Sequence, residues 1–235
     1  MADESPALRR HPLRGDVSCT DRWLVVGLHR PARITGWPVV APATGAAVAW
    51  LRVTDGDLRP PVDAGTFLEQ RMAERGLAGA AGFLTSAVLS RFALVTRQYG
   101  DHQVRAVATV GMGNARRIGD GPGPSGRIGT INILCETSFS LTPGAALEAL
   151  SLATEARTLA VLEAGIPSTL PGATQAAATG TGTDSIVIAD PLAGAAPTPY
   201  CGKHTVFGHL IGSAVLEAVR TGVRRWQTAG GAVHG

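Results

Sequence analysis

The sequence predicts one α/β domain in which helices flank a mixed β-sheet, with an α+β arrangement as the alternative. Three observations lead to this prediction. The chain has 235 residues, which is enough to bury one substantial core. Short apolar runs rich in β-branched residues recur along the chain, and segments with the spacing of amphipathic helices lie between them. A charged fraction of only 17% and 30 glycines fit a compact fold rather than a disordered chain.

The domain is expected to cover residues 19–225, after a loosely ordered N-terminal arm (residues 1–18) and before a C-terminal tail (residues 226–235). Its strands are expected in six apolar runs, whose length and β-branched content favour strands over helices. These runs are residues 22–28, 38–53, 91–99, 103–111, 129–136 and 184–190.

Three helices are expected between and after these strands. The first covers residues 63–76. The second starts at Thr142, whose side chain can cap a helix, and runs to Ala164, just before a glycine. The third, roughly residues 208–223, places its apolar side chains on one face, as expected for a helix that packs on a sheet.

Composition argues against several classes of protein. There are 21 lysines and arginines against 18 aspartates and glutamates, with no continuous basic run and 5% aromatic residues, so a nucleic-acid partner has little support. The three cysteines show no C-x-x-C spacing, which argues against a disulfide framework or a cysteine-rich zinc site. Charges interrupt the longest apolar stretch, residues 147–164, and the N-terminal region lacks an apolar segment. We therefore expect a cytoplasmic protein with no membrane contact and no metal or other cofactor, and the sequence leaves a homo-oligomer open.

Polar segments follow or precede several predicted strands, and the first is "GMGNARRIGD" (residues 111–120). Gly111 and Gly113 let the backbone approach a ligand closely, and the Asn114 amide can both donate and accept hydrogen bonds. A tight turn explains the same glycines equally well. The segment does not match the dinucleotide-binding fingerprint, because an arginine stands where the third glycine is needed.

The next two candidates lie on a strand and on a helix. Thr130 and Asn132 are two residues apart in "GTINILCE" (residues 129–136), so both project from the same face of a strand. A half-solvated strand face would explain them as well. Glu155 stands among alanines, leucines and threonines of the second helix, where a carboxylate needs a partner or a function unless it is exposed to solvent.

The segment "ATGTGTDSIVIAD" (residues 178–190) supplies Thr179, Gly180, Thr181, Gly182, Thr183 and Asp184. The Asp184 carboxylate can accept a proton or orient a water molecule. The threonine hydroxyls can donate to a developing oxyanion, and the glycines leave room for a substrate. This combination predicts an active-site loop.

Lys203, His204 and Thr205 are expected in a turn just ahead of the third helix, whose N-terminus favours negative charge. Histidine titrates near neutral pH, which suits His204 to proton transfer. The sequence contains no G-x-S-x-G elbow, P-loop or H-E-x-x-H motif. These residues predict hydrolysis or group transfer on a neutral polar substrate. The other histidines are expected to be structural: His11, His29, His102, His209 and His234.

Five segments, in order, resemble the adenosylcobinamide amidohydrolase family: "TVGMGNARRIGD", "GTINILCE", "ATEARTLAVLEAGI", "ATGTGTDSIVIAD" and "CGKHTVFGHLIGSAV". The resemblance covers roughly residues 80–220, and "GFLTSA" (residues 82–87) looks like an earlier stretch of the family. It implies hydrolysis of the amide that joins the aminopropanol arm to the corrin ring of adenosylcobinamide, which gives adenosylcobyric acid. Four residues depart from the family pattern and leave the corrinoid preference open: Met112, Arg157, Cys201 and Lys203.

The resulting hypothesis is that Asp184 or Glu155 activates water, that His204 protonates the leaving amine, and that Thr181 and Thr183 hold the oxyanion. A direct nucleophile is the alternative, with Thr181, Thr183 or Cys201 in that role. A corrinoid-binding protein without catalysis, or an amidohydrolase acting on another small molecule, would also fit the sequence. Substrate contacts are expected from Gly111, Gly113, Asn114, Thr130, Asn132, Thr179, Gly180, Gly182, Lys203 and Thr205.

Overall fold

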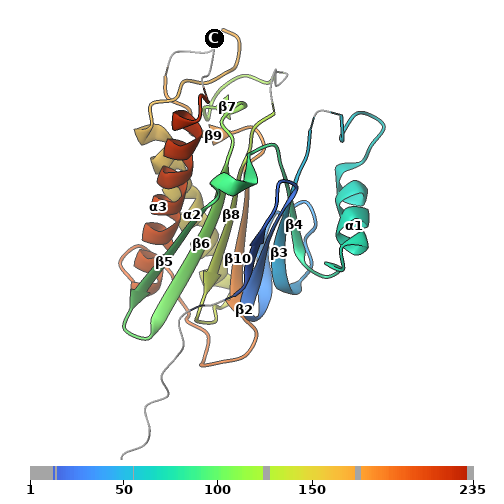
Figure 1. The fold of residues 1–235 in the computed structure, drawn as a ribbon. Helices are drawn as coiled ribbons and strands as arrows, with labels where there is room; N and C mark the ends of the chain where they lie inside the picture. The colour runs from blue at the N-terminus through green and yellow to red at the C-terminus, as the bar shows by residue number, and fades with distance from the viewer. Residues whose placement is uncertain (1–12, 14, 55, 124–127, 173–175, 232–235) are drawn as a thin grey trace, which may run out of the picture.

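The structure, a computed structural model, describes residues 13, 15–54, 56–123, 128–172 and 176–231. Within these ranges, one mixed sheet of eight strands runs in the order β4-β3-β2-β10-β8-β6-β5, with β1 paired to β2 (Figure 1). Its strands are β1 (Val17–Cys19), β2 (Trp23–Gly36), β3 (Thr44–Arg52), β4 (Ala81–Thr85), β5 (Ala93–Tyr99), β6 (His102–Val110), β8 (Ile131–Thr137) and β10 (Ser185–Pro191). A separate two-stranded ribbon pairs β7 (Ala115–Arg116) with β9 (Gly180–Thr181).

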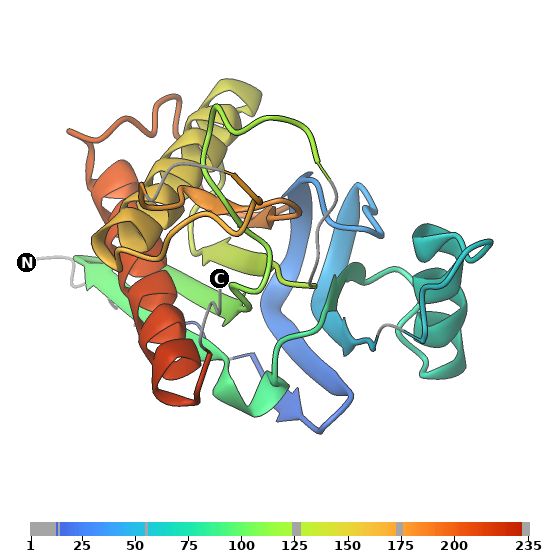
Figure 2. The ribbon, with the colours of Figure 1, turned by 90° about the horizontal axis from the view of Figure 1, so that it is seen from above.

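Three helices flank the sheet, which confirms the predicted α/β class. They are α1 (Ala64–Glu74), α2 (Pro143–Glu163) and α3 (Val206–Thr228). The helices α2 and α3 cover one face of the sheet, and α1 packs beside β3 and β4 at its far end (Figure 2). The second face is buried because the sheet curves and packs on itself, so that Trp50 and Phe83 of one half share a core with Val107 and Leu134 of the other. None of the helices in the described ranges is long and apolar enough to cross a membrane.

Local chemistry explains where the two long helices begin. The Thr142 hydroxyl accepts a hydrogen bond from the backbone N–H of Ala145, 3.2 Å away, which confirms the predicted cap. The Thr205 hydroxyl caps α3 in the same way, by accepting from Gly208 at 2.9 Å. The third helix therefore begins at Val206, two residues before the predicted start at residue 208.

The structure differs from the predicted elements at several boundaries. The strand β4 (Ala81–Thr85) lies outside the six predicted runs, and β2 continues to Gly36, beyond the predicted end at residue 28. The helix α3 extends to Thr228 and so includes three residues assigned to the tail, while β1 includes the last two residues of the expected arm. Longer elements form because tertiary pairing stabilises residues whose local preference is weak. His11 and His234 lie outside the described residues.

One crossover positions the loops that matter for function. The chain leaves β8, passes through α2 and returns as β10, parallel to β8 and paired with it from Ser185 opposite Asn132. The segments that precede two parallel strands meet at the same edge of the sheet. The Thr/Gly loop, defined here as residues 178–184, therefore lies beside the residues that lead into β8.

Candidate functional site

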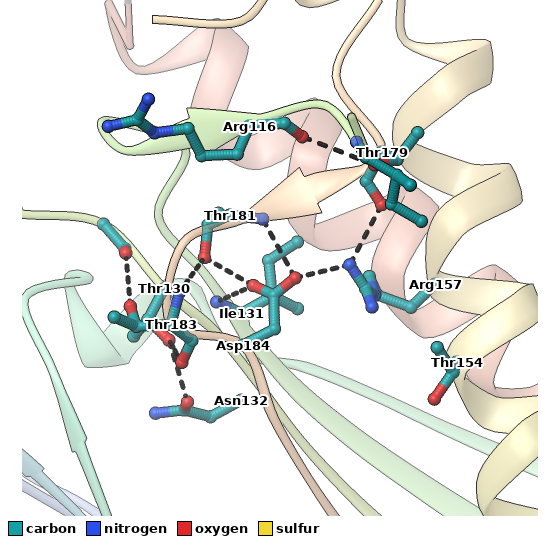
Figure 3. Close-up of polar contacts among 12 residues, drawn as sticks. Arg116, Thr130, Ile131, Asn132, Thr154, Arg157, Thr179, Thr181, Thr183 and Asp184 are labelled. Carbon is teal, nitrogen blue, oxygen red and sulfur yellow. Dashed lines mark hydrogen bonds and ion pairs between the residues drawn. The ribbon is translucent and has the colours of Figure 1, made fainter. Parts of the chain in front are cut away.

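Asp184 is the centre of a hydrogen-bond network at the start of β8 and β10 (Figure 3). Its carboxylate accepts from the backbone N–H groups of Ile131 (3.1 Å) and Thr181 (2.9 Å), and from the Thr181 hydroxyl (2.5 Å). A fourth hydrogen bond comes from the Arg157 guanidinium, 2.5 Å away, and the Asp184 side chain is only 7% exposed. Both oxygens are thus engaged by donors. This environment suits a carboxylate that holds the loop in place better than one that takes a proton from water.

Arg157 reaches this network from α2. Its Nη1 atom donates to Asp184 and also to the backbone carbonyl of Thr179, at 2.9 Å. Sequence reasoning noted Arg157 only as a departure from the family pattern and gave it no role. One signal in the sequence could have pointed to Arg157. It is an arginine two residues after Glu155, on a helix with few other charges.

The two glycines of the Thr/Gly loop make room for protein side chains. A Cβ atom on Gly180 would lie 1.7 Å from Nη1 of Arg157, and one on Gly182 would lie 2.6 Å from Nδ2 of Asn114. These positions were expected to leave space for a substrate. In the structure, that space is filled by the arginine and the asparagine.

The threonine hydroxyls are also engaged within the protein. Thr181 donates to Asp184, and Thr183 donates to the carbonyl of Gly129 at 3.0 Å. The Thr179 hydroxyl accepts from the backbone N–H of Ile118 at 2.9 Å. A hydroxyl has one hydrogen to donate, so Thr181 and Thr183 would have to break these bonds before they could bind an oxyanion.

Two further predicted segments join the same edge of the sheet. The Thr130 hydroxyl donates to the carbonyl of Thr183 at 2.8 Å, and the Asn132 amide donates to the carbonyl of Leu84 at 2.8 Å. The backbone N–H of Gly111 donates to the carbonyl of Thr130 at 2.9 Å. The structure thus brings together the candidates at positions 111–114, 130–132 and 179–184.

A groove of about 820 Å³ lies between α2 and α3. Glu155, which lines it, stands two residues before Arg157 of this network on α2. Glu155 and Lys203 form an ion pair at the groove, with side chains that are 51% and 70% exposed. The Glu155 carboxylate is therefore accessible, in contrast to Asp184. Apolar side chains provide much of the wall: Ile118, Leu152, Leu159, Leu162 and Leu216.

His204 and Asp184 make no direct polar contact within the described residues. Phe207, in the first turn of α3, packs on Phe139 just beyond the end of β8, with ring centroids 4.6 Å apart. Asp184 is bonded to Ile131 at the other end of that strand. With no hydrogen bond or ion pair joining Asp184 to His204 in the described ranges, their action on one bound carbonyl stays a prediction. His204 itself is exposed, and within the described residues its side chain makes no hydrogen bond.

The environment of Cys201 does not suit a nucleophile. The side chain is fully buried, and burial raises the pKa of the thiol to about 12. A cysteine attacks as the thiolate, which such a pKa makes scarce at neutral pH. Burial raises the pKa of the Cys135 thiol as well.

A second, smaller cleft of about 270 Å³ opens where β8 and β10 end. His29, His102 and Glu136 line it, and Glu136 is held by a buried ion pair with Arg105 at 2.6 Å. The His102 ring packs against Phe207, with centroids 4.9 Å apart. This cleft is much smaller than the groove between the helices.

Comparison with known proteins gives a family and two relatives. The family model described as adenosylcobinamide amidohydrolase matches residues 9–231. An uncharacterised protein of Methanocaldococcus jannaschii is 34% identical over 154 residues, which cover 57% of this chain and 59% of the relative. A protein named adenosylcobinamide amidohydrolase, from Methanosarcina mazei, is 27% identical over 165 residues, which cover 67% of this chain and 73% of the relative.

Proposed function

The chain belongs to the adenosylcobinamide amidohydrolase family, and from this membership we propose that it hydrolyses the aminopropanol amide of adenosylcobinamide, releasing adenosylcobyric acid. Family membership supports hydrolase activity in general. The choice of a corrinoid as substrate is more specific than hydrolase activity. It draws on the name of the relative from Methanosarcina mazei.

The groove between α2 and α3 is the observation that supports this function best. Its volume of about 820 Å³ lies near the upper end for ligand sites, which suits a bulky substrate. Leucine and isoleucine side chains form apolar walls that can contact a large macrocycle, while Glu155 and Lys203 supply charge at one place in it. An apolar groove with few polar groups is typical of sites that bind a large organic molecule in one orientation.

The chemistry assigned to the groove starts at Glu155. In this proposal its carboxylate takes a proton from a water molecule, and the resulting hydroxide attacks the amide carbonyl carbon. The Lys203 ammonium stabilises the negative charge that develops on the carbonyl oxygen. The carbon–nitrogen bond then breaks, and the leaving amine receives a proton from His204, which follows Lys203 in the chain. Asp184 holds the neighbouring loop and takes no proton.

The direct test is incubation of the purified protein with adenosylcobinamide, followed by chromatography for adenosylcobyric acid and free aminopropanol. We expect both products in equal amounts. Tight binding of cobinamide without release of aminopropanol would instead indicate a corrinoid-binding protein. The absence of both binding and turnover would contradict the proposed substrate. A panel of other small amides would then be the next assay.

A further inference from the structure

We propose that Arg157 is a positioning residue, which fixes the Thr/Gly loop (residues 178–184) against α2 beside the general base Glu155. This inference rests on the proposed function, because it assigns Arg157 a role in placing that base. Its geometrical basis is that one nitrogen, Nη1, donates both to the Asp184 carboxylate (2.5 Å) and to the Thr179 carbonyl (2.9 Å). The two acceptors lie at the two ends of the loop, so a single contact ties both ends to the helix (Figure 3).

Burial makes this contact different from the other ion pairs of α2. The side chains of Arg157 and Asp184 are 13% and 7% exposed. In the pair between Glu163, at the end of α2, and Arg220 of α3, the arginine is 35% exposed and the glutamate 42%. Water screens an exposed pair and weakens it, whereas a buried carboxylate that loses its partner is left uncompensated. Removal of Arg157 should therefore disturb the loop much more than removal of Arg220 disturbs its own surroundings.

The contact also links the loop to the groove. Glu155 and Arg157 are two residues apart on α2, about 3 Å along the helix axis and on different sides of the helix. One side chain thus lines the groove while the other holds the loop. A shift of the helix against the loop would move Glu155 relative to a substrate, and displacements of about 1 Å can lower turnover about 100-fold.

The geometry predicts which substitutions are tolerated. Both bonds come from Nη1, and within the described residues the buried Nε atom of Arg157 has no hydrogen-bond partner. A lysine ammonium placed at the Nη1 position could make both bonds with its own hydrogens. Gly180 leaves the space that either group needs, since a Cβ atom there would lie 1.7 Å from Nη1.

The experiment compares Arg157→Ala and Arg157→Lys with Arg220→Ala as the matched control. For Arg157→Ala we expect kcat to fall about 100-fold with a much smaller change in KM, and added guanidinium to restore part of the loss. Arg157→Lys should stay within about threefold of the original kcat, because one ammonium nitrogen can make both bonds. Arg220→Ala should leave kcat unchanged. Equal effects of Arg157→Ala and Arg220→Ala, or a kcat of Arg157→Lys as low as that of Arg157→Ala, would overturn the inference.

Hydrogen exchange separates this inference from the proposed function. Whatever the substrate, Arg157→Ala should speed amide exchange in residues 178–184 at least tenfold, while Arg157→Lys and Arg220→Ala leave it unchanged. If the protein does not hydrolyse adenosylcobinamide but these exchange rates behave as expected, the function fails and the positioning role stands. Unchanged exchange in Arg157→Ala overturns the positioning role. If Arg157→Ala does not fold, Arg157→Lys must still fold and protect the loop, and faster exchange in that variant overturns the role.

Discussion

Asp184 and Glu155 are carboxylates in the same region of the molecule, and their surroundings give them different capabilities. Four donors occupy the Asp184 carboxylate in a buried network. Glu155 has one ionic partner and is half exposed, so its carboxylate can exchange that partner for water or substrate. At the scale of single residues, accessibility rather than residue type distinguishes the proposed base from the organising carboxylate.

Glu155→Gln tests this distinction. The amide cannot take the proton from water, so kcat with adenosylcobinamide should fall by about 100- to 10,000-fold. The fold should be unaffected because the side chain is 51% exposed. Glu163→Gln is the matched control on the same helix, since Glu163 pairs with Arg220 on the surface. A near-native kcat for Glu155→Gln would remove Glu155 from the mechanism.

His204→Ala and His209→Ala together test the proposed proton donor. Loss of a general acid should lower kcat by about 100-fold or more, so His204→Ala should be strongly impaired. His209 lines the groove but stands one turn into α3, farther along the chain from Lys203 than His204 does, and its variant should retain most activity. The reverse pattern in steady-state rates would transfer the role to His209.

At the scale of elements, α2 joins the groove to the network, so its stability affects both. Thr142→Ala removes the hydroxyl that caps the helix and should lower the free energy of unfolding by about 1 kcal/mol, measured by urea denaturation. Thr154→Ala is the matched control, because that hydroxyl donates to Leu150 within the same helix and alanine favours helix. A loss in Thr154→Ala as large as that in Thr142→Ala would argue against a specific capping contribution.

At the scale of the whole molecule, the curved sheet depends on a buried charge pair. Arg105 and Glu136 are each 3% exposed, and they join the adjacent strands β6 and β8. Arg105 also donates to the carbonyl of Gly27 at 2.7 Å, and Glu136 accepts from the backbone N–H of His29 at 2.6 Å. The pair thus fixes β2 across the enclosed face of the sheet.

Arg105→Met should lower the free energy of unfolding by about 3–5 kcal/mol, because it leaves the Glu136 carboxylate buried without its partner. The double substitution Arg105→Met with Glu136→Leu should be less damaging than the single one, since no unpaired charge remains. Urea denaturation of the original protein, Arg105→Met, Glu136→Leu and the double variant measures both effects. A double variant that loses as much stability as the two single changes added together would show that the charges do not depend on each other.

Much of the fold could be predicted because its signals are local. Thr142 marks the start of α2, and the runs at residues 103–111 and 129–136 match β6 and β8 except for one residue of each strand, His102 and Thr137. The run that forms β4 is only five residues long, and its place at the sheet edge depends on pairing with β3, more than 30 residues earlier. Such pairing leaves no signal in the run itself.

The sequence by itself determined the α/β class, the family and the gathering of polar residues before β8 and β10, because periodicity, caps and motif order lie along the chain. Tertiary structure alone decided what those residues do. It placed Arg157 on Asp184, filled the spaces beside Gly180 and Gly182, and paired Glu155 with Lys203 at an exposed groove. Hydrogen-bond partners and exposure arise from segments that meet only on folding, and these two properties determine whether a carboxylate organises a loop or is free to take a proton.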